Sequence, residues 1–353
     1  MDNKRLYVDI HAIQTVPPSC VNRDDTGRPK TAMYGGVNRA RVSSQSWKHA
    51  IRESFKELFS EEQLGSRTKY VTTLVAEAIK KQSAEIDDEK ATKLAVDALS
   101  DAGIKTNEKK NNTTGALFFI SAAQAEKLAE LKIAGEKDKK LYKEALKAAP
   151  SIDIALFGRM VADDTDYNID ACAQVAHSIS THGIQNEYDY FTAVDDCSPA
   201  DNAGAGHLGT MEFNSSTLYR YATVNAADLY RLIGKDVAEA VKGFTEAFIR
   251  SMPTGKQNSY ANRTLPDMIY VTVRKDQPIN LSGAFENPVV SKTGYTEGSI
   301  KALFNYAQKI YDDYSGAPAF SFVIGNDAVL GAEKVNLNQL LDKLYELISN
   351  EVV

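Results

Sequence analysis

The chain has 353 residues, of which 43% are hydrophobic and 25% charged, and these proportions exclude a disordered chain, a collagen and a coiled-coil rod. The formal net charge of −6 argues mildly against a polyanionic partner, but the charge is spread unevenly. Residues 1–56 contain ten Lys or Arg and five Asp or Glu, a balance of +5, so a local basic surface for nucleic acid remains compatible with the sequence.

Three features indicate a protein of the reducing cytoplasm. No apolar run approaches ~18 residues, so a membrane-spanning helix is not expected. The first apolar run stops at Asp9, which is unlike a secretory signal. Cys20, Cys172 and Cys197 lie far apart and are odd in number, which argues against a disulfide framework or a CxxC metal site. We therefore expect a cytoplasmic protein that does not contact a membrane.

The first predicted element is a strand over residues 5–14, where apolar and polar side chains alternate. One face is apolar, so we expect a half-buried strand that ends at Pro17-Pro18. The residues that follow, up to Val42, show neither a helical nor a strand period. Loops of that length are usually functional or disordered. Because this one contains several Arg, Asn and Asp residues, we predict a functional loop.

A helix is predicted to begin at Ser43–Ser46, since serine hydroxyls accept the free N–H groups of a first turn. Lys48, Arg52 and Lys56 recur at helical spacing and form a cationic stripe. Most such stripes are only solvated surface, but a helix N-terminus beside one is a ready anion site. The adjoining Arg-rich loop favours phosphate binding here. The apolar stripe that packs on the core is formed by Trp47, Ile51, Phe55 and Leu58.

The rest of the chain alternates helical and strand signals. Residues 61–150, which include a long helical pattern at 122–148, are interpreted as a helical insertion without a site. Ile152–Met160 alternate and predict another strand of the main sheet, and the polar residues 161–216 are typical of a long arm. The remaining elements are strands at 217–224, 268–274 and 319–324 and helices at 226–251, 298–314 and 336–349. This order predicts an α+β fold, with helices backing a small antiparallel sheet of the RNA-recognition form.

Few motifs for catalysis stand out. His177 and His182 are five residues apart, but no carboxylate or thiol completes a metal set. Adjacent acids could hold Mg²⁺ for phosphodiester cleavage, although adjacent Asp residues in loops are more often turn formers. These acids are Asp24-Asp25, Asp163-Asp164 and Asp195-Asp196. A metal-dependent nuclease therefore stays open, while no cofactor and no resident metal are expected.

Blocks of sequence that span most of the chain match a known family in the correct order. They are Pro18–Asp25, Gly35–Lys48, Ile152–Met160, Ile179–His182, Asp189–Asp196, His207–Phe213, Tyr219–Ala222 and Gly255–Gln257. Together they resemble the backbone subunit of the type I-E CRISPR Cascade complex, the CasC family. Residues 61–150 and the last sixty residues resemble the family least, and the family is more basic than Val37-Asn38 at that turn.

The resemblance implies an RNA-recognition-motif-like (ferredoxin-like) palm with a helical fingers insertion and a long thumb hairpin. In this sequence the palm would comprise residues 1–60, 151–160 and 217–353. The fingers would be residues 61–150, and the thumb arm residues 161–216.

The same resemblance implies a subunit that binds CRISPR RNA and is not an enzyme. Copies of the chain would polymerise along the guide, grip its phosphates regardless of sequence and kink it for pairing with a complementary target DNA strand. Further partners would be the other Cascade subunits, namely the large, small, guide-end-capping and guide-processing subunits.

Residue by residue, the resemblance assigns an RNA-binding set. The positions on the palm loop and helix that would grip guide phosphates are Asn22, Arg23, Arg41, Gln45, Lys48 and Arg52. Met160, which follows Arg159 of the same set, and Phe191 in the thumb would be wedges beside a displaced base. Lys256, Gln257 and Asn258 would lie on a loop near the nucleic acid.

Two other functions remain open at this point. Related backbone subunits of type III systems cut target RNA with a loop aspartate, and Asp24 would be the candidate here. A self-assembling scaffold that binds no nucleic acid is the second alternative.

Overall fold

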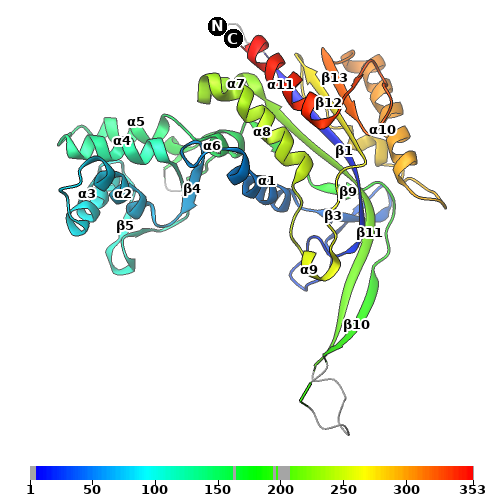
Figure 1. The fold of residues 1–353 in the computed structure, drawn as a ribbon, viewed down its shortest axis with the longest axis horizontal. Helices are drawn as coiled ribbons and strands as arrows, with labels where there is room; N and C mark the ends of the chain where they lie inside the picture. The colour runs from blue at the N-terminus through cyan, green and yellow to red at the C-terminus, as the bar shows by residue number, and fades with distance from the viewer. Residues whose placement is uncertain (1–4, 162–163, 194–195, 198–206, 353) are drawn as a thin grey trace. The chain divides into compact units, whose positions relative to one another are not determined.

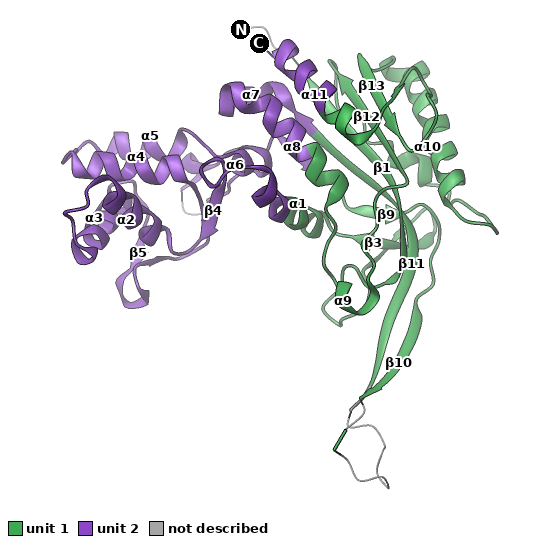
Figure 2. Cartoon of the chain, viewed as in Figure 1, with its two compact units in different colours: residues 1–51, 175–223, 245–341 green, residues 52–174, 224–244, 342–353 purple. Residues whose placement is uncertain are grey.

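The computed structural model describes residues 5–161, 164–193, 196–197 and 207–352. The chain divides into two compact units, each assembled from segments that are far apart in the sequence (Figure 2). Unit 1 comprises residues 1–51, 175–223 and 245–341. Unit 2 comprises residues 52–174, 224–244 and 342–353.

A large sheet forms the framework of unit 1 (Figure 1). Its strands follow the order β14-β13-β12-β1-β11-β9-β3-β2, and β10 and β8 also pair with β11. The pairs β1–β12 and β12–β13 are antiparallel, so Ile10 lies opposite Val271 and Val271 opposite Phe322. The strands are β1 (Tyr7–Ser19), β2 (Thr31–Tyr34), β3 (Val37–Val42), β8 (Ala173–Val175), β9 (Ser178–Ser180), β10 (Glu187–Ala193), β11 (His207–Asn225), β12 (Met268–Arg274), β13 (Phe320–Ile324) and β14 (Glu333–Lys334). The α+β class is confirmed, and the RNA-recognition-motif-like detail stays a prediction.

Strand β1 differs from the predicted strand in two ways. It is buried on both faces, because Asp9 and His11 are as inaccessible as their apolar neighbours. These two residues share the face of Ile13, which packs in one core cluster with Leu303 of helix α10 (Thr296–Ile310). The strand also does not end at Pro17-Pro18. Pairing with β12 stops at Ile13, so β12 does not need a backbone N–H from Pro17 or Pro18, and the prolines do not end the strand.

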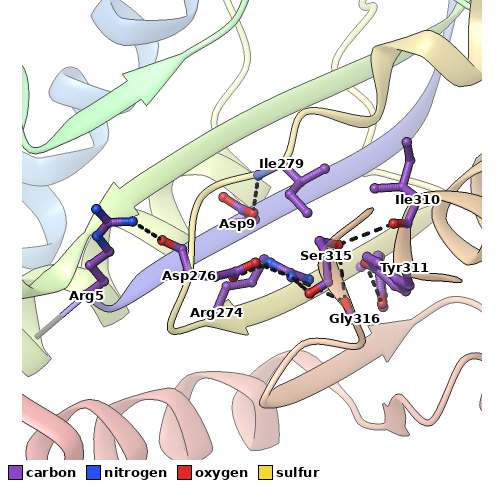
Figure 3. A network of polar contacts seen from close by, with 10 residues as sticks. Arg5, Asp9, Arg274, Asp276, Ile279, Ile310, Tyr311, Ser315 and Gly316 are labelled. Atoms are coloured by element: carbon purple, nitrogen blue, oxygen red, sulfur yellow. Dashed lines mark hydrogen bonds and ion pairs between the residues drawn. The ribbon is translucent and has the colours of Figure 1, made fainter. Parts of the chain in front are cut away.

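A buried polar network lies on this face of β1 (Figure 3). The carboxylate of Asp9 accepts hydrogen bonds from the N–H of Ile279 at 2.8 Å and the hydroxyl of Tyr221 at 3.0 Å. Burial raises the pKa of Asp9 to about 6 and lowers the pKa of His11 to about 3. Arg274 is paired with Asp276 at 2.8 Å at the edge of the network.

The predicted loop after β1 contains two strands, β2 and β3, so the absence of a strand period there was misleading. Thr31 pairs with Ala40 and Tyr34 with Val37, so the two strands form a hairpin. Arg39 and Arg41 interrupt the apolar pattern that a buried strand normally shows.

The predicted arm contains a long antiparallel hairpin, in which β10 pairs with the first part of β11. Tyr188 lies opposite Glu212 and Phe191 opposite Gly209. Figure 1 shows this hairpin extending from the sheet of unit 1. Residues 162–163, 194–195 and 198–206 of the predicted arm lie outside the described residues.

Unit 2 contains a group of helices, as predicted for residues 61–150. The helices are α2 (Val71–Gln82), α3 (Asp88–Asp101), α4 (Ala122–Ile133), α5 (Lys139–Lys147) and α6 (Ile152–Phe157). Two short antiparallel pairs accompany them: β4 (Gly65–Thr68) with β7 (Phe118–Ser121), and β5 (Thr106–Asn107) with β6 (Thr113–Thr114). Val75, Leu99, Leu128 and Leu146 are fully buried in one core. The single helix predicted at 122–148 is two helices, separated near Gly135 with its left-handed backbone (φ 73°).

The strand predicted over Ile152–Met160 is wrong. Residues Ile152–Phe157 form helix α6, and they belong to unit 2. Five consecutive residues of this short helix are buried, so its sequence carries no helical period. The helix ends at Gly158, whose φ is 78° and where a Cβ would lie 2.8 Å from the carbonyl oxygen of Ile169.

The remaining helices agree in broad terms with prediction. They are α1 (Ser44–Leu58), α7 (Ala226–Ile233), α8 (Val237–Arg250) and α11 (Leu337–Val352). The short helix α9 (Gln257–Tyr260) was not predicted, because these residues were expected on a loop. The helix predicted at 226–251 is divided at Gly234, whose φ is 61°. None of the helices that the structure describes is long and apolar enough to cross a membrane.

Candidate nucleic-acid interface

Backbone hydrogen bonds tie the 22–30 loop to strand β3 and to the start of helix α1. The N–H of Lys30 donates to the carbonyl of Asn22 at 2.8 Å, and the N–H of Arg41 donates to the carbonyl of Lys30 at 2.9 Å. The side-chain oxygen of Asn22 accepts the N–H of Ser43 at 3.0 Å. Residues that the sequence separates by about twenty positions therefore form one surface in unit 1.

Asp24 closes a turn inside this loop. Its Oδ1 accepts hydrogen bonds from the N–H and the hydroxyl of Thr26, at 2.9 and 2.8 Å, and from the N–H of Arg28 at 3.0 Å. The hydroxyl of Thr26 is the main cause that holds the pKa of Asp24 below its usual value. These bonds favour the turn interpretation of Asp24-Asp25 over the metal-binding one.

The other predicted metal candidates gain no support. Asp163 and Asp195 lie outside the described residues. Among the residues that are described, no group of three or more His, Cys, Asp or Glu side chains could hold a metal ion.

A second loop, residues 254–260, meets the first at a glycine. A Cβ on Gly255 would lie 2.0 Å from the carbonyl oxygen of Val21, so no other residue fits this approach. The contact brings Lys256 and Arg23 to the same thiol: burial raises the pKa of Cys20, and these two cations act to lower it. The predicted residues of the two loops, including Gln257 and Asn258 at the start of α9, thus converge in unit 1.

The hairpin begins beside this second loop. The hydroxyl of Tyr260 contacts the sulfur of Met211 at 3.3 Å, and its ring lies 6.0 Å from that of Phe213. Directly paired residues share a face of a hairpin, so Phe191, opposite Gly209, lies on the face of Met211 and Phe213.

The two faces of the hairpin both carry aromatic side chains. Phe191 covers Gly209, where a Cβ would lie 2.4 Å from its ring, and it remains 37% exposed. On the opposite face Tyr188 and Tyr190 are 69% and 65% exposed. The described part of the hairpin therefore offers flat apolar surface in both directions, which suits stacking on bases.

Helix α1 begins at this surface, with its first turn capped by Ser43. The N–H of Ser46 donates to Oγ of Ser43 at 3.3 Å, and the first turn holds no acidic residue. Gln45 is exposed in this turn, and Lys48 is half-buried with its pKa lowered by burial. A helix N-terminus with these neighbours can bind an anion.

Arg41 projects from β3 near this helix start. Its Nη1 lies 3.0 Å from Nδ1 of His177, and its Nε donates to the carbonyl of Thr31 at 3.4 Å. Burial, Arg41 and Lys30 together lower the pKa of His177.

Three residues of the predicted set belong to unit 2. Met160 is 84% exposed. Arg52 pairs with Asp153 at 2.9 Å and donates to the carbonyl of Gly65 at 2.8 Å. Arg159 is buried, and its guanidinium donates to four oxygen atoms of the unit 2 core. These belong to the carbonyls of Phe119, Leu146 and Tyr167 and the side chain of Gln124.

Sequence reasoning missed two residues of this surface. Lys30 was counted only in the local charge balance, and His177 was weighed only as a metal ligand with His182. No local pattern could reveal the pair of Arg41 and His177, because 136 positions separate them.

Comparison with known proteins places the chain. A family model described as CT1975-like protein matches residues 8–349. The chain belongs to this family. The CT1975-like chain is also similar to a chain of a solved "CRISPR RNA-guided surveillance complex, pre-nicking", with 31% identity and a TM-score of 0.82 over 97% of this chain and all of that one. A chain of a second "CRISPR RNA-guided surveillance complex" shows 29% identity and a TM-score of 0.64 over 97% and 99% of the two chains. None of the curated proteins matches this sequence. The family resemblance is confirmed, and the type I-E subtype stays a prediction.

Proposed function

We propose that this CT1975-like protein is a CRISPR RNA-binding backbone subunit of a Cascade surveillance complex. The observation that carries the proposal is the convergence of two basic loops, at Arg23 and Lys256, on one surface of unit 1. The structures that resemble the whole chain are titled as CRISPR RNA-guided complexes, which agrees with such a surface.

The side chains of this surface suit phosphate and ribose better than base edges. Arg23, Arg41 and Lys256 offer only donors, and Asn22 and Gln45 offer amides that pair with any nucleotide backbone. A guide of arbitrary sequence has to be held in this way, because base pairing with the target reads its sequence. The grip on the guide is therefore independent of its sequence.

The proposal extends to assembly. Copies of the chain polymerise along the guide, together with the other Cascade subunits, and hold it for pairing with a target DNA strand. Phe191 and Met160 act as apolar wedges that kink the guide, since stacking on a base is indifferent to base identity. No catalytic residue is assigned. The ribonuclease alternative rests on Asp24, whose carboxylate is engaged in its own turn.

Removing one cation from this surface tests the proposal. Arg23→Ala or Lys48→Ala should weaken binding of two single-stranded RNAs of unrelated sequence to the same degree. Losing one phosphate contact should also lower the slope of log affinity against log salt by about 0.7. Fluorescence anisotropy at several salt concentrations measures both quantities.

Lys334→Ala is the matched control, because Lys334 is an exposed cation of unit 1 that pairs with Asp327. It removes the same charge away from the two loops. Unchanged affinity and slope in both test variants, or an equal loss in the control, would contradict the proposed surface.

A further inference from the structure

Three nitrogen-bearing residues lie close together beside the start of helix α1, and two of them were not assigned to the interface by sequence. Lys30 comes from the 22–30 loop, Arg41 from β3, and His177 from the residue before β9. Arg41 and Lys30 are joined by a backbone hydrogen bond, and Arg41 contacts His177 directly. All three side chains are at least partly accessible to solvent.

No acid balances this cluster. Within the described ranges, neither Lys30 nor Arg41 takes part in an ion pair, and the charged groups that act on His177 are these two cations alone. The neighbouring strand β11 contacts the residues before β9 through its backbone, because the carbonyl of Tyr221 accepts the N–H of Ala176. A site with cations on two sides and no carboxylate attracts an anion.

The contact between Arg41 and His177 fixes the protonation state of the imidazole. A guanidinium is a donor only, so Nδ1 of His177 has to accept, and the single ring proton lies on Nε2. If Nδ1 also carried a proton, its N–H and the N–H of Arg41 would point at each other across 3.0 Å, and the imidazolium would add a positive charge beside Arg41 and Lys30. In the anion-free protein the imidazole is therefore held neutral.

We propose that Lys30, Arg41 and His177 form a phosphate subsite at which RNA binding takes up one proton on His177. In this step an N–H of Arg41 leaves Nδ1 and donates to a phosphodiester oxygen, and Nδ1 takes a proton from solvent. The negative charge of the phosphate offsets the repulsion that keeps the free imidazole neutral. This inference deepens the proposed function and rests on it.

The consequence is that the affinity for RNA depends on pH in a direction that the proposal fixes. Because the bound state holds a proton that the free state lacks, affinity rises as pH falls through the pKa of His177 in the complex. The rise amounts to about tenfold for each unit by which binding raises that pKa. Well above that pKa, both states are neutral at this residue and the affinity is constant.

The first test measures RNA affinity between about pH 5.5 and 8 at constant ionic strength, with oligonucleotides of about 12 nucleotides. Wild type should bind more tightly as pH falls. His177→Gln keeps an oxygen that can accept from Arg41 but cannot be protonated, so its affinity should stay constant across this pH range, whatever its value at pH 8. His49→Gln is the control, because His49 is an exposed histidine of α1 outside the cluster, and it should keep the wild-type profile.

A flat wild-type profile, or a profile that His49→Gln rather than His177→Gln flattens, overturns the proton uptake at His177. Failure of the wild type to bind RNA at pH 8 contradicts the proposed function instead, because the subsite is neutral at His177 under that condition.

The second test needs no RNA and shows whether the cluster binds an anion, independently of the proposed function. The ring Cε1–H signals of the five histidines are titrated by NMR with and without inorganic sulfate, and His177→Gln identifies the signal. Sulfate should raise the pKa of His177 and leave the pKa of His49 unchanged. Equal behaviour of the two signals shows that the cluster is no anion subsite.

Discussion

Two arginines of unit 1, which lie on the same strand, differ in their burial and in their partners. In the sheet interior Arg39 is fully buried, and it donates to the carbonyls of Tyr34, Ser180 and Phe285 at 2.8 to 3.1 Å. Two residues further along β3, Arg41 is partly exposed and contacts the ring of His177. A count of basic residues gives these two arginines equal weight.

The difference teaches that the partner of a cation identifies its role better than its charge does. Arg220 has an environment like that of Arg39. Its guanidinium lies 3.8 Å from the ring centre of Trp47 and donates to the side-chain oxygen of Gln14 at 2.6 Å. Burial lowers the pKa of Arg220 to about 9. Arginines of this kind join segments of the fold, whereas a cation whose neighbours are loops and solvent is available to a ligand.

The largest expected effect separates the two arginines of β3. Arg39→Ala removes three hydrogen bonds to buried carbonyls and leaves a cavity, so it should lower the free energy of unfolding by about 3 kcal/mol or more. Arg41→Ala should cost less than about 1 kcal/mol and instead weaken RNA binding. Urea denaturation and anisotropy measure the two quantities, and similar stability losses in both variants would remove the distinction.

The next effect concerns the buried acid of β1. The pKa of Asp9 is about 6 in the fold against 3.8 ordinarily, so the folded state keeps a proton that the unfolded state loses, and stability falls as pH rises through this window. The pKa of His11 is about 3 against 6.5, so the folded state lacks a proton that the unfolded state holds, and stability rises with pH. Between about pH 4 and 6 the two contributions offset each other.

Asp9→Asn should expose the contribution of His11. The stability of the variant minus that of wild type should increase by about 1.4 kcal/mol per pH unit between about pH 4 and 6. Urea denaturation at three pH values measures this difference, with the exposed Asp25→Asn as control. A difference that is constant with pH would show that Asp9 is ionised in the interior.

The last expected effect tests the contact between the two loops. Gly255→Ala places a methyl group against the carbonyl of Val21, so the loops have to separate, at a cost of about 1–3 kcal/mol. RNA affinity should fall because Lys256 and Arg23 no longer converge. Gly115→Ala is the control, since Gly115 has no heavy atom within 4 Å of the added group. An affinity equal to that of the control would show that the loops act independently.

Strong local patterns made much of the fold predictable. Strand β12 was placed at its observed bounds, because Met268–Val273 is rich in β-branched and aromatic residues and is followed by the charged Arg274-Lys275-Asp276. Helix α6 was mistaken for a strand, since Ile152–Leu156 are buried on all sides and six residues are too few to show a period. Strand β3 was missed because its arginines find partners only in the folded chain.

The site was predictable where the family resemblance named its residues. It was less predictable where the role of a residue depends on the side chains and carbonyls that it contacts in the folded chain. The loops of Asn22 and Lys256 were named from sequence, and the structure brings them together through Gly255. Arg159 was named beside Met160, yet only the folded chain shows that its guanidinium is held by main-chain oxygens. Charge alone carries no information about such long-range contacts.

The ring of Phe191 over Gly209 has a consequence for the entropy of assembly. An aromatic side chain that is immobilised only on contact with its partner loses rotamer freedom at that moment, at a cost of about 0.5–1.5 kcal/mol. The ring of Phe191 instead already packs against the backbone of Gly209, in the space that a side chain at position 209 would need. A surface that stacks on Phe191 therefore meets a preorganised ring, and this part of the ordering cost belongs to folding rather than to binding.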